Sequence, residues 1–220
     1  EDFVIESDYD TRKIQIYYPN NKLINSDTLF ILMNDGEELF NAADSWHNME
    51  WGIDEKLKQM NLSESDLNFV IIAIHSAKKG NRFFIDETKR YAEYFPKEAI
   101  DYFDRGIKKR LYQKWINRSS LNYLEFLTLD VIPFVEEKFD IKLNNNNLGI
   151  IGASMGGLAA LNALIEHPDL FNFAGCVSTH WVGIKPLEYV VLPITREIKG
   201  DEDTANAIIS YVGNNITNID

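Results

Sequence analysis

The sequence is poor in cysteine, in basic charge and in long apolar runs. Cys176 is its single cysteine, which excludes an internal disulfide framework and a metal site built on several thiolates. Cys176 lies in an apolar run and is expected to be inert. Acidic residues outnumber basic ones by 34 to 22, giving a formal net charge of -12. Nucleic acids and anionic membrane surfaces would be repelled at long range, so neither is expected as a partner.

No apolar run approaches the ~18 residues that a membrane-spanning helix needs. The first residues, Glu1-Asp2-Phe3, lack the basic and then apolar segment of a secretory signal. The chain is expected to be soluble, either cytoplasmic or exported with its signal peptide already removed, and it indicates no oligomeric state. With 220 residues and 45% apolar content, it fits one domain spanning 1–220 with a sizeable core.

Apolar, β-rich runs alternate with helical stretches along the chain, a pattern typical of an α/β fold with a mostly parallel sheet and helices on both faces. A starting hairpin is expected from 3–7 and 13–18, with a stop at 19–21. Further strands are expected at 29–33, 69–74, 148–151 and 173–177, and helices at 51–60, 121–139, 157–166 and 205–212. Pro133 should kink its helix. The stretch 95–122 is interpreted as a lid or cap.

The chemistry is concentrated in Gly152-Ala153-Ser154-Met155-Gly156-Gly157, between a predicted strand and a predicted helix. A sharp turn that presents a serine needs small residues two positions before and after it, because side chains there would strike neighbouring backbone. The helix N-terminus offers N–H groups and partial positive charge to an oxyanion. Ser154 is therefore the candidate nucleophile, with the N–H of Met155 as oxyanion donor. The other interpretation, an idle serine or a phosphate-binding turn, lacks the dinucleotide fingerprint and the Lys-Ser/Thr ending of a phosphate loop.

Four segments together resemble the putative esterase family of α/β-hydrolases, which includes enterochelin esterases, feruloyl esterases, formylglutathione hydrolases and mycolyltransferases. They are Tyr18-Pro19, Met33-Asn34-Asp35-Gly36-Glu37-Glu38-Leu39-Phe40, Arg90-Tyr91-Ala92-Glu93-Tyr94-Phe95-Pro96 and the Ser154 turn. A fifth, Ser178-Thr179-His180-Trp181, resembles a bacterial subgroup. The resemblance covers nearly the whole chain.

The resemblance assigns the second oxyanion donor to the backbone N–H of Glu37, beside Asp35 and Gly36. It also implies that Arg90, Glu93 and Tyr94 line the substrate cleft, although an arginine near a glutamate is often only a structural ion pair on a loop. Asp35, Gly36, His180 and Trp181 are further candidate substrate contacts.

The chain departs from the family pattern after Ser154. In this fold the triad's acid and histidine follow the nucleophile, and the family's segments that carry them should begin beyond Asp220. The C-terminal strands are therefore expected to be missing, the strand at 173–177 would be a bare sheet edge, and residues 1–220 alone are expected to be nearly inactive. Of the four histidines, His47 and His75 precede Ser154, His167 is interpreted as a helix-end cation, and His180 as a substrate contact rather than the base.

The function predicted from the sequence is a serine carboxylic-ester hydrolase that acts through an acyl-enzyme on a small or sugar-linked ester. No metal and no organic cofactor is required. Two alternatives remain open: an acyltransferase that uses the same residues, and a ligand-binding protein on a hydrolase fold without a working triad.

Overall fold

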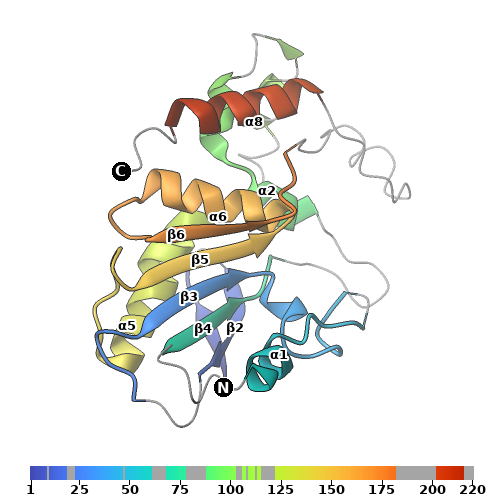
Figure 1. Ribbon diagram of the computed structural model, residues 1–220. Helices are drawn as coiled ribbons and strands as arrows, with labels where there is room; N and C mark the ends of the chain where they lie inside the picture. Colours follow the sequence, from blue (N-terminus) through green and yellow to red (C-terminus); the bar gives the residue numbers. More distant parts are fainter. Residues whose placement is uncertain are drawn as a thin grey trace.

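The structure, a computed structural model, describes residues 1–8, 10–18, 23–46, 48–60, 68–77, 88–102, 106–107, 109–111, 113–114, 122–181 and 202–215. Within these ranges a six-stranded sheet, in the order β1-β2-β4-β3-β5-β6, forms the centre (Figure 1). Its strands are β1 (Asp2–Glu6), β2 (Thr11–Tyr17), β3 (Leu29–Asn34), β4 (Phe69–Ile74), β5 (Leu148–Ala153) and β6 (Phe173–Val177). All six agree with the predicted positions to within three residues. The predicted stop at 19–21 and His47 lie outside the described residues.

Strand directions confirm the predicted mostly parallel sheet. β3, β4, β5 and β6 are parallel to one another, whereas β1 and β2 form an antiparallel hairpin and β2 pairs antiparallel with β4. The carboxyl ends of β3 and β5, which are direct neighbours, therefore lie at the same edge of the sheet. In open sheets of this kind that edge is where ligands bind.

The central strands β3 and β4 are largely buried on both faces, which is why they show no polar alternation in sequence. On one face Phe30 and Val70 join the large cluster that includes α2, α5 and α6 residues. On the other face Met33 and Ile71 form a smaller cluster, against which Ile53 of α1 packs. Successive residues of one strand point to opposite faces, so each apolar strand serves two cores.

The four predicted helices fall close to their predicted positions, whereas α2, which contains Arg90, was not predicted. The helices are α1 (Ile53–Gln59), α2 (Thr88–Tyr94), α4 (Tyr123–Phe126), α5 (Ile132–Phe139), α6 (Met155–Glu166) and α8 (Glu202–Asn215), with 3-10 turns η1 (Gly36–Glu38) and η3 (Lys97–Tyr102). The single helix predicted over 121–139 is divided by a π-helical turn, η4 (Leu127–Val131). Pro133 lies near the start of α5 and has no N–H to donate. The helix is disturbed directly before it, where the π-helical turn η4 interrupts the regular α-helix.

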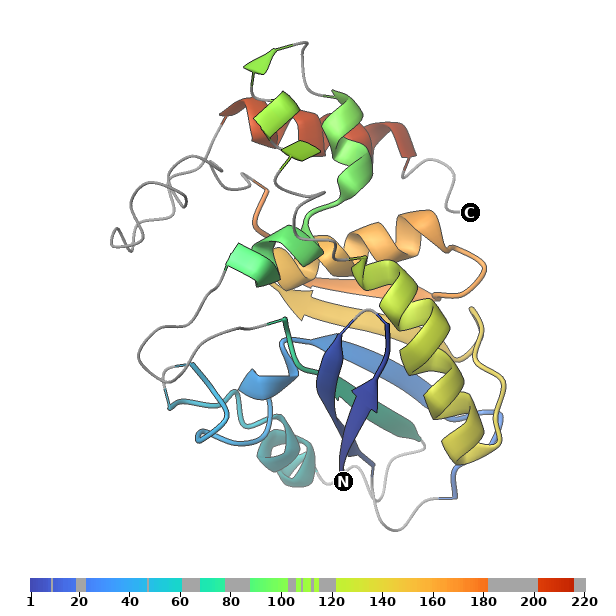
Figure 2. The same ribbon diagram turned by 180° about the vertical axis from the view of Figure 1, so that it is seen from behind.

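Part of the predicted lid, 95–122, lies outside the described residues. Its described portion includes η3, which packs against α8, and α8 in turn lies over α6 (Figures 1 and 2). The hydroxyl of the buried Tyr211 of α8 lies 2.6 Å from each of two acceptor oxygens on α6, Asn162 Oδ1 and Glu166 Oε1, to which it donates. The α8 and η3 layer is thereby fixed to the helix that begins at the Ser154 turn. Its role as a lid stays a prediction.

β6 forms an edge of the sheet among the described residues, pairing with β5 alone. Cys176 and Val177 are exposed on it, although Cys176 lies in an apolar run of the sequence. Partial burial of its sulfur nevertheless raises the pKa of Cys176, an effect that outweighs a hydrogen bond with Thr179, and this favours the unreactive thiol. No helix in the described ranges has the length and apolar character needed to cross a membrane.

Candidate functional site

Ser154 occupies the turn between β5 and α6, as the strand, turn and helix pattern predicts. Its backbone has φ 56° and ψ -120°, a combination that costs a residue with a side chain roughly 1–3 kcal/mol. Its N–H donates to the carbonyl of Val177 at 2.9 Å, and its own carbonyl accepts from the N–H of His180 at 3.1 Å. The end of β6 and the loop after it therefore hold the strained backbone of Ser154 from both sides.

Gly152 and Gly156 are required by contact, as the sequence predicts. A Cβ on Gly152 would lie 2.2 Å from the carbonyl oxygen of Gly156. A Cβ on Gly156 would lie 2.8 Å from a carboxylate oxygen of Asp35. Real Cβ atoms do not approach other heavy atoms so closely, and the Asp35 carboxylate is held in place by Arg90. Only glycine therefore permits a turn this tight.

Met155 is the first residue of α6, and the N–H groups of a helix's first turn have no partner within the helix. These groups and the helix dipole place partial positive charge directly after Ser154. The arrangement suits an anion that forms beside the serine hydroxyl. The role of the Met155 N–H as an oxyanion donor stays a prediction.

The turn after β3 lies beside the Ser154 turn. Asp35 has φ 58° and ψ 45°, the left-handed conformation, and begins the 3-10 turn η1 that contains Gly36 and Glu37. A Cβ on Gly36 would lie 2.6 Å from the backbone of Ala73 in β4, so this turn packs directly onto the sheet. The assignment of the second oxyanion donor to the Glu37 N–H stays a prediction.

Hydrogen bonds to the side chains of Asp35 and Glu37 hold the turn after β3 in place. Both carboxylate oxygens of Asp35 accept from Arg90, at 2.5 and 2.7 Å. The buried carboxylate of Glu37 accepts from the N–H and the hydroxyl of Ser76, at 3.0 and 2.6 Å, and from the indole of Trp46 at 3.0 Å. Such a turn is held rigidly, as preorganised backbone donors require.

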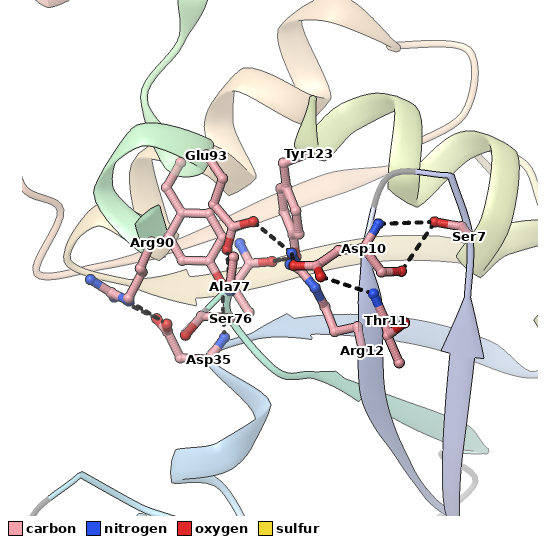
Figure 3. A network of polar contacts seen from close by, with 12 residues as sticks. Ser7, Asp10, Thr11, Arg12, Asp35, Ser76, Ala77, Arg90, Glu93 and Tyr123 are labelled. Carbon is pink, nitrogen blue, oxygen red and sulfur yellow. Dashed lines mark hydrogen bonds and ion pairs between the residues drawn. The ribbon is translucent and has the colours of Figure 1, made fainter. Parts of the chain in front are cut away.

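Arg90 belongs to helix α2 rather than to a loop, and its partner is Asp35 rather than the nearby Glu93 (Figure 3). Both members of the pair are buried, with 5% and 2% of their surface exposed. Burial alone would lower the pKa of Arg90, but the charge and hydrogen bonds of Asp35 raise it. The pair supports the turn from within, and direct contact of Asp35 or Arg90 with a substrate stays a prediction.

Glu93 has a second arginine as its partner, Arg12 of β2, at 2.9 Å. Its other carboxylate oxygen accepts from the N–H of Ala77 at 2.7 Å, and Figure 3 shows this link between the hairpin, α2 and the end of β4. The Arg12 guanidinium also lies over the ring of Phe126, 4.9 Å from its centroid. Glu93, predicted as a cleft residue, is 5% exposed and joins three elements behind the site.

Tyr94 and Asn34 complete the polar contacts behind the two turns. Tyr94 is 1% exposed, and its hydroxyl accepts from the N–H of Asp35 at 3.3 Å. Burial raises the pKa of Tyr94 well above its ordinary value, so it stays protonated. Asn34, the last residue of β3, bonds Gly156 and Tyr123. Sequence reasoning gave Asn34 and Tyr123 no role, although a polar residue that ends a buried strand was the available signal.

The described histidines differ in their relation to Ser154. His75 contacts Gln15 through Nε2 at 3.1 Å, and His167 follows the last residue of α6, roughly 18 Å along the helix axis from Ser154. His180 bonds the Ser154 carbonyl through its backbone, and its ring meets that of Tyr91 edge to face at 6.3 Å. Trp181 beside it is 38% exposed. Substrate contacts by His180 and Trp181 stay predictions.

Within the described ranges, no group of three or more His, Cys, Asp and Glu side chains is arranged to hold a metal ion.

Comparison with solved structures gives the same fold. A ferulic acid esterase matches 100% of this chain and 70% of its own at a TM-score of 0.55 and 15% identity. An IroE-like serine hydrolase from Shewanella oneidensis matches 100% and 69% at 0.54 and 18% identity. The enterobactin esterase FES from Shigella flexneri matches 99% of this chain and 51% of its own at 0.55 and 12% identity. At these identities the likeness establishes the fold alone.

Sequence comparison identifies the family. The uncharacterized protein YbbA of Bacillus subtilis is 30% identical over 98 residues, which are 44% of this chain and 36% of that protein. The match thus spans about a third of this curated relative. The family described as putative esterase matches residues 10–186, which include both turns of the site. Because that match covers most of the chain and the fold agrees with it, the protein belongs to the putative esterase family of α/β-hydrolases.

Proposed function

We propose that this protein hydrolyses carboxylic esters through an acyl-enzyme formed on Ser154. The observation that carries the proposal is the backbone of Ser154, held at φ 56° and ψ -120° at the start of a helix. An idle serine would give no reason to maintain such strain, whereas a nucleophile presented above the sheet edge does. Membership of the putative esterase family supports the same reaction class.

In the proposed reaction, the Ser154 hydroxyl oxygen attacks the ester carbonyl carbon while its proton passes to a histidine. The N–H groups of Met155 and Glu37 stabilise the oxyanion, each worth about 3 kcal/mol in the transition state. The alcohol leaves with the proton, and water then releases the acid from Ser154. We place the histidine and its acid partner outside the described residues, because in this fold both follow the nucleophile along the chain.

The proposed substrate is a small or sugar-linked ester. The formal charge of -12 favours neutral or cationic esters over strongly anionic ones. The Tyr91 ring meets that of His180, which Trp181 follows in the chain, and the Arg90 guanidinium lies over the ring of Trp46. These aromatic side chains lie near the two turns and would give the cleft an aromatic character. The names of the matched structures, an enterobactin esterase and a ferulic acid esterase, are compatible with an ester of this kind.

Hydrolysis of 4-nitrophenyl acetate by the full natural chain tests the proposal. We expect a burst of nitrophenol equal to one equivalent of protein, followed by slower turnover, because acylation precedes deacylation. Ser154→Ala should abolish both phases. Ser210→Ala, which alters an exposed serine of α8, should leave both unchanged. A burst that persists in Ser154→Ala would disprove the assigned nucleophile.

The same assay separates the two other interpretations of the sequence. Adding an alcohol such as glycerol or glucose distinguishes a hydrolase from an acyltransferase, since a transferase would form the new ester in preference to the free acid. A folded full natural chain without burst or turnover on any ester would favour a ligand-binding protein.

A further inference from the structure

Asn34 contacts both turns of the site. Its Nδ2 donates to the carbonyl oxygen of Gly156 at 2.8 Å, and its Oδ1 accepts from the hydroxyl of Tyr123 at 2.5 Å. The side chain is fully buried, with 0% exposed. Because a tyrosine hydroxyl donates to the oxygen and a carbonyl accepts from the nitrogen, the two partners allow only one orientation of the amide.

The position of Asn34 in the chain gives these bonds their significance. Asn34 directly precedes Asp35, where the turn that carries the proposed Glu37 donor begins. Gly156 directly follows Met155, which carries the other proposed donor. The bond from Asn34 to Gly156 is thus a side-chain link between two segments that are otherwise joined through the ladder of β3 and β5.

The side chain of Asn34 is closely packed against the two glycines. A Cβ on Gly152 would lie 2.9 Å from Nδ2 of Asn34. A Cβ on Gly156 would lie 3.2 Å from the Cβ of Asn34. The amide therefore fills the space that the two glycines leave open. A smaller side chain would allow the two turns to shift relative to one another.

We propose that Asn34 is a positioning residue that fixes the Met155 and Glu37 amides at the separation an oxyanion requires. This inference rests on the proposed esterase function and adds a residue to it. Asn34 makes no contact with the ester; it acts through the two turns. A displacement of about 1 Å in such donors lowers the rate on the order of a hundredfold, so the effect should appear in kcat rather than in KM.

The chain offers a matched control. Asn162 of α6 is also buried, 7% exposed, and its Oδ1 also lies 2.6 Å from a tyrosine hydroxyl, that of Tyr211. Asn162→Ala therefore removes the same side chain and one acceptor of a buried tyrosine hydroxyl, which keeps Glu166 as its other acceptor. It does so away from both turns, and should lower the stability of the protein without lowering kcat.

The first test compares Asn34→Ala with Asn162→Ala in the full natural chain. For hydrolysis of 4-nitrophenyl acetate, Asn34→Ala should lower kcat on the order of a hundredfold with KM little changed, whereas Asn162→Ala should keep the native kcat. Affinity for phenylboronic acid, whose serine adduct mimics the oxyanion, should fall only in Asn34→Ala. Equal kinetics in the two variants would overturn the inference.

A second variant covers the case in which Asn34→Ala does not fold. Asn34→Asp keeps the shape and the acceptor for Tyr123, but an ionised carboxylate would repel the Gly156 carbonyl, whereas a protonated one can donate to it. Burial and the neighbouring Asp35 should raise the pKa of the new carboxyl, while Arg90 and Arg12 oppose this rise. Its rate relative to the native chain should therefore increase as pH falls. A ratio that does not change with pH would contradict the inference.

Failure of the inference and failure of the proposed function give different results. If the native chain shows the burst and Asn34→Ala matches it, the esterase stands and the role of Asn34 is refuted. If the native chain shows no burst and no boronate binding, the proposed function fails and the role of Asn34 fails with it.

Discussion

The backbone of Ser154 combines a φ of 56° with a ψ of -120°, a conformation that glycine tolerates far better than serine. Proteins keep such strain where a geometry is useful, and the cost is met by surrounding contacts. Those contacts are visible at this residue: Val177 and His180 hold its backbone, and Gly152 and Gly156 leave room for it.

Replacing Ser154 with glycine should stabilise the protein relative to replacing it with alanine. Ser154→Gly relieves strain of roughly 1–3 kcal/mol and loses roughly 0.5–1 kcal/mol to the greater entropy of the unfolded glycine. The net gain should raise Tm by about 2–4 °C per kcal/mol. Thermal unfolding of the two inactive variants measures it. A lower Tm for Ser154→Gly would show that the turn is not strained.

Removing one partner of the buried ion pair of Arg90 and Asp35 should lower the stability of the protein more than removing both. Arg90→Met leaves a buried carboxylate without its arginine, and should cost about 3–5 kcal/mol of unfolding free energy. Adding Asp35→Asn, which tolerates the left-handed backbone of this position, removes the orphaned charge and should recover part of that loss. Urea titrations of the single and double variants give the coupling energy, and a double variant less stable than either single one would contradict this.

At the scale of elements, sequence reasoning located all six strands because buried parallel strands are continuous apolar runs bounded by turn residues. It found the helix at 121–139 but not its π turn, since the register of a helix near Pro133 depends on what Leu127 and Val131 pack against. It placed Arg90 beside Glu93 by proximity in sequence. The actual partners, Asp35 and Arg12, come from strands far away in the chain and leave no local signal.

The attachment of α8 to α6 should depend on one hydroxyl. Tyr211→Phe removes both 2.6 Å bonds, to the buried Asn162 and the exposed Glu166. The buried Asn162 oxygen then lacks this donor, at a cost of about 1–3 kcal/mol. We expect faster proteolysis within 202–215 and a lower Tm. Asn215→Ala, which removes a 3.3 Å contact with Tyr102, is the milder control. Unchanged proteolysis in Tyr211→Phe would show that apolar packing alone holds α8.

At the scale of the whole molecule, the fold and the family could be predicted from local patterns, and the Ser154 turn from its glycine spacing. The contacts behind the site could not. Asn34 bonds Gly156 across 122 positions, and Tyr123 reaches Asn34 across 89. Such pairs are set by how the strands align in the sheet, which a single sequence does not reveal.

Three buried tyrosines should make the protein sensitive to high pH. Burial raises the pKa of Tyr94, Tyr123 and Tyr211 above their ordinary value. Above a pH of about 10, tyrosines of the unfolded chain lose protons that the folded chain retains, so the unfolding free energy should fall as pH rises through that range. Urea midpoints at pH 8 to 11 measure this. Tyr123→Phe should show a shallower fall, and an equally steep one would contradict the assignment.

Reaction of the full natural chain with a fluorophosphonate probe isolates the reactivity of Ser154 from any choice of substrate. We expect one probe per chain, found by peptide mass spectrometry on Ser154, and no labelling of Ser154→Ala or of urea-unfolded protein. A folded native chain that stays unlabelled, or that carries the probe on another residue, would contradict the assignment of Ser154 as the nucleophile.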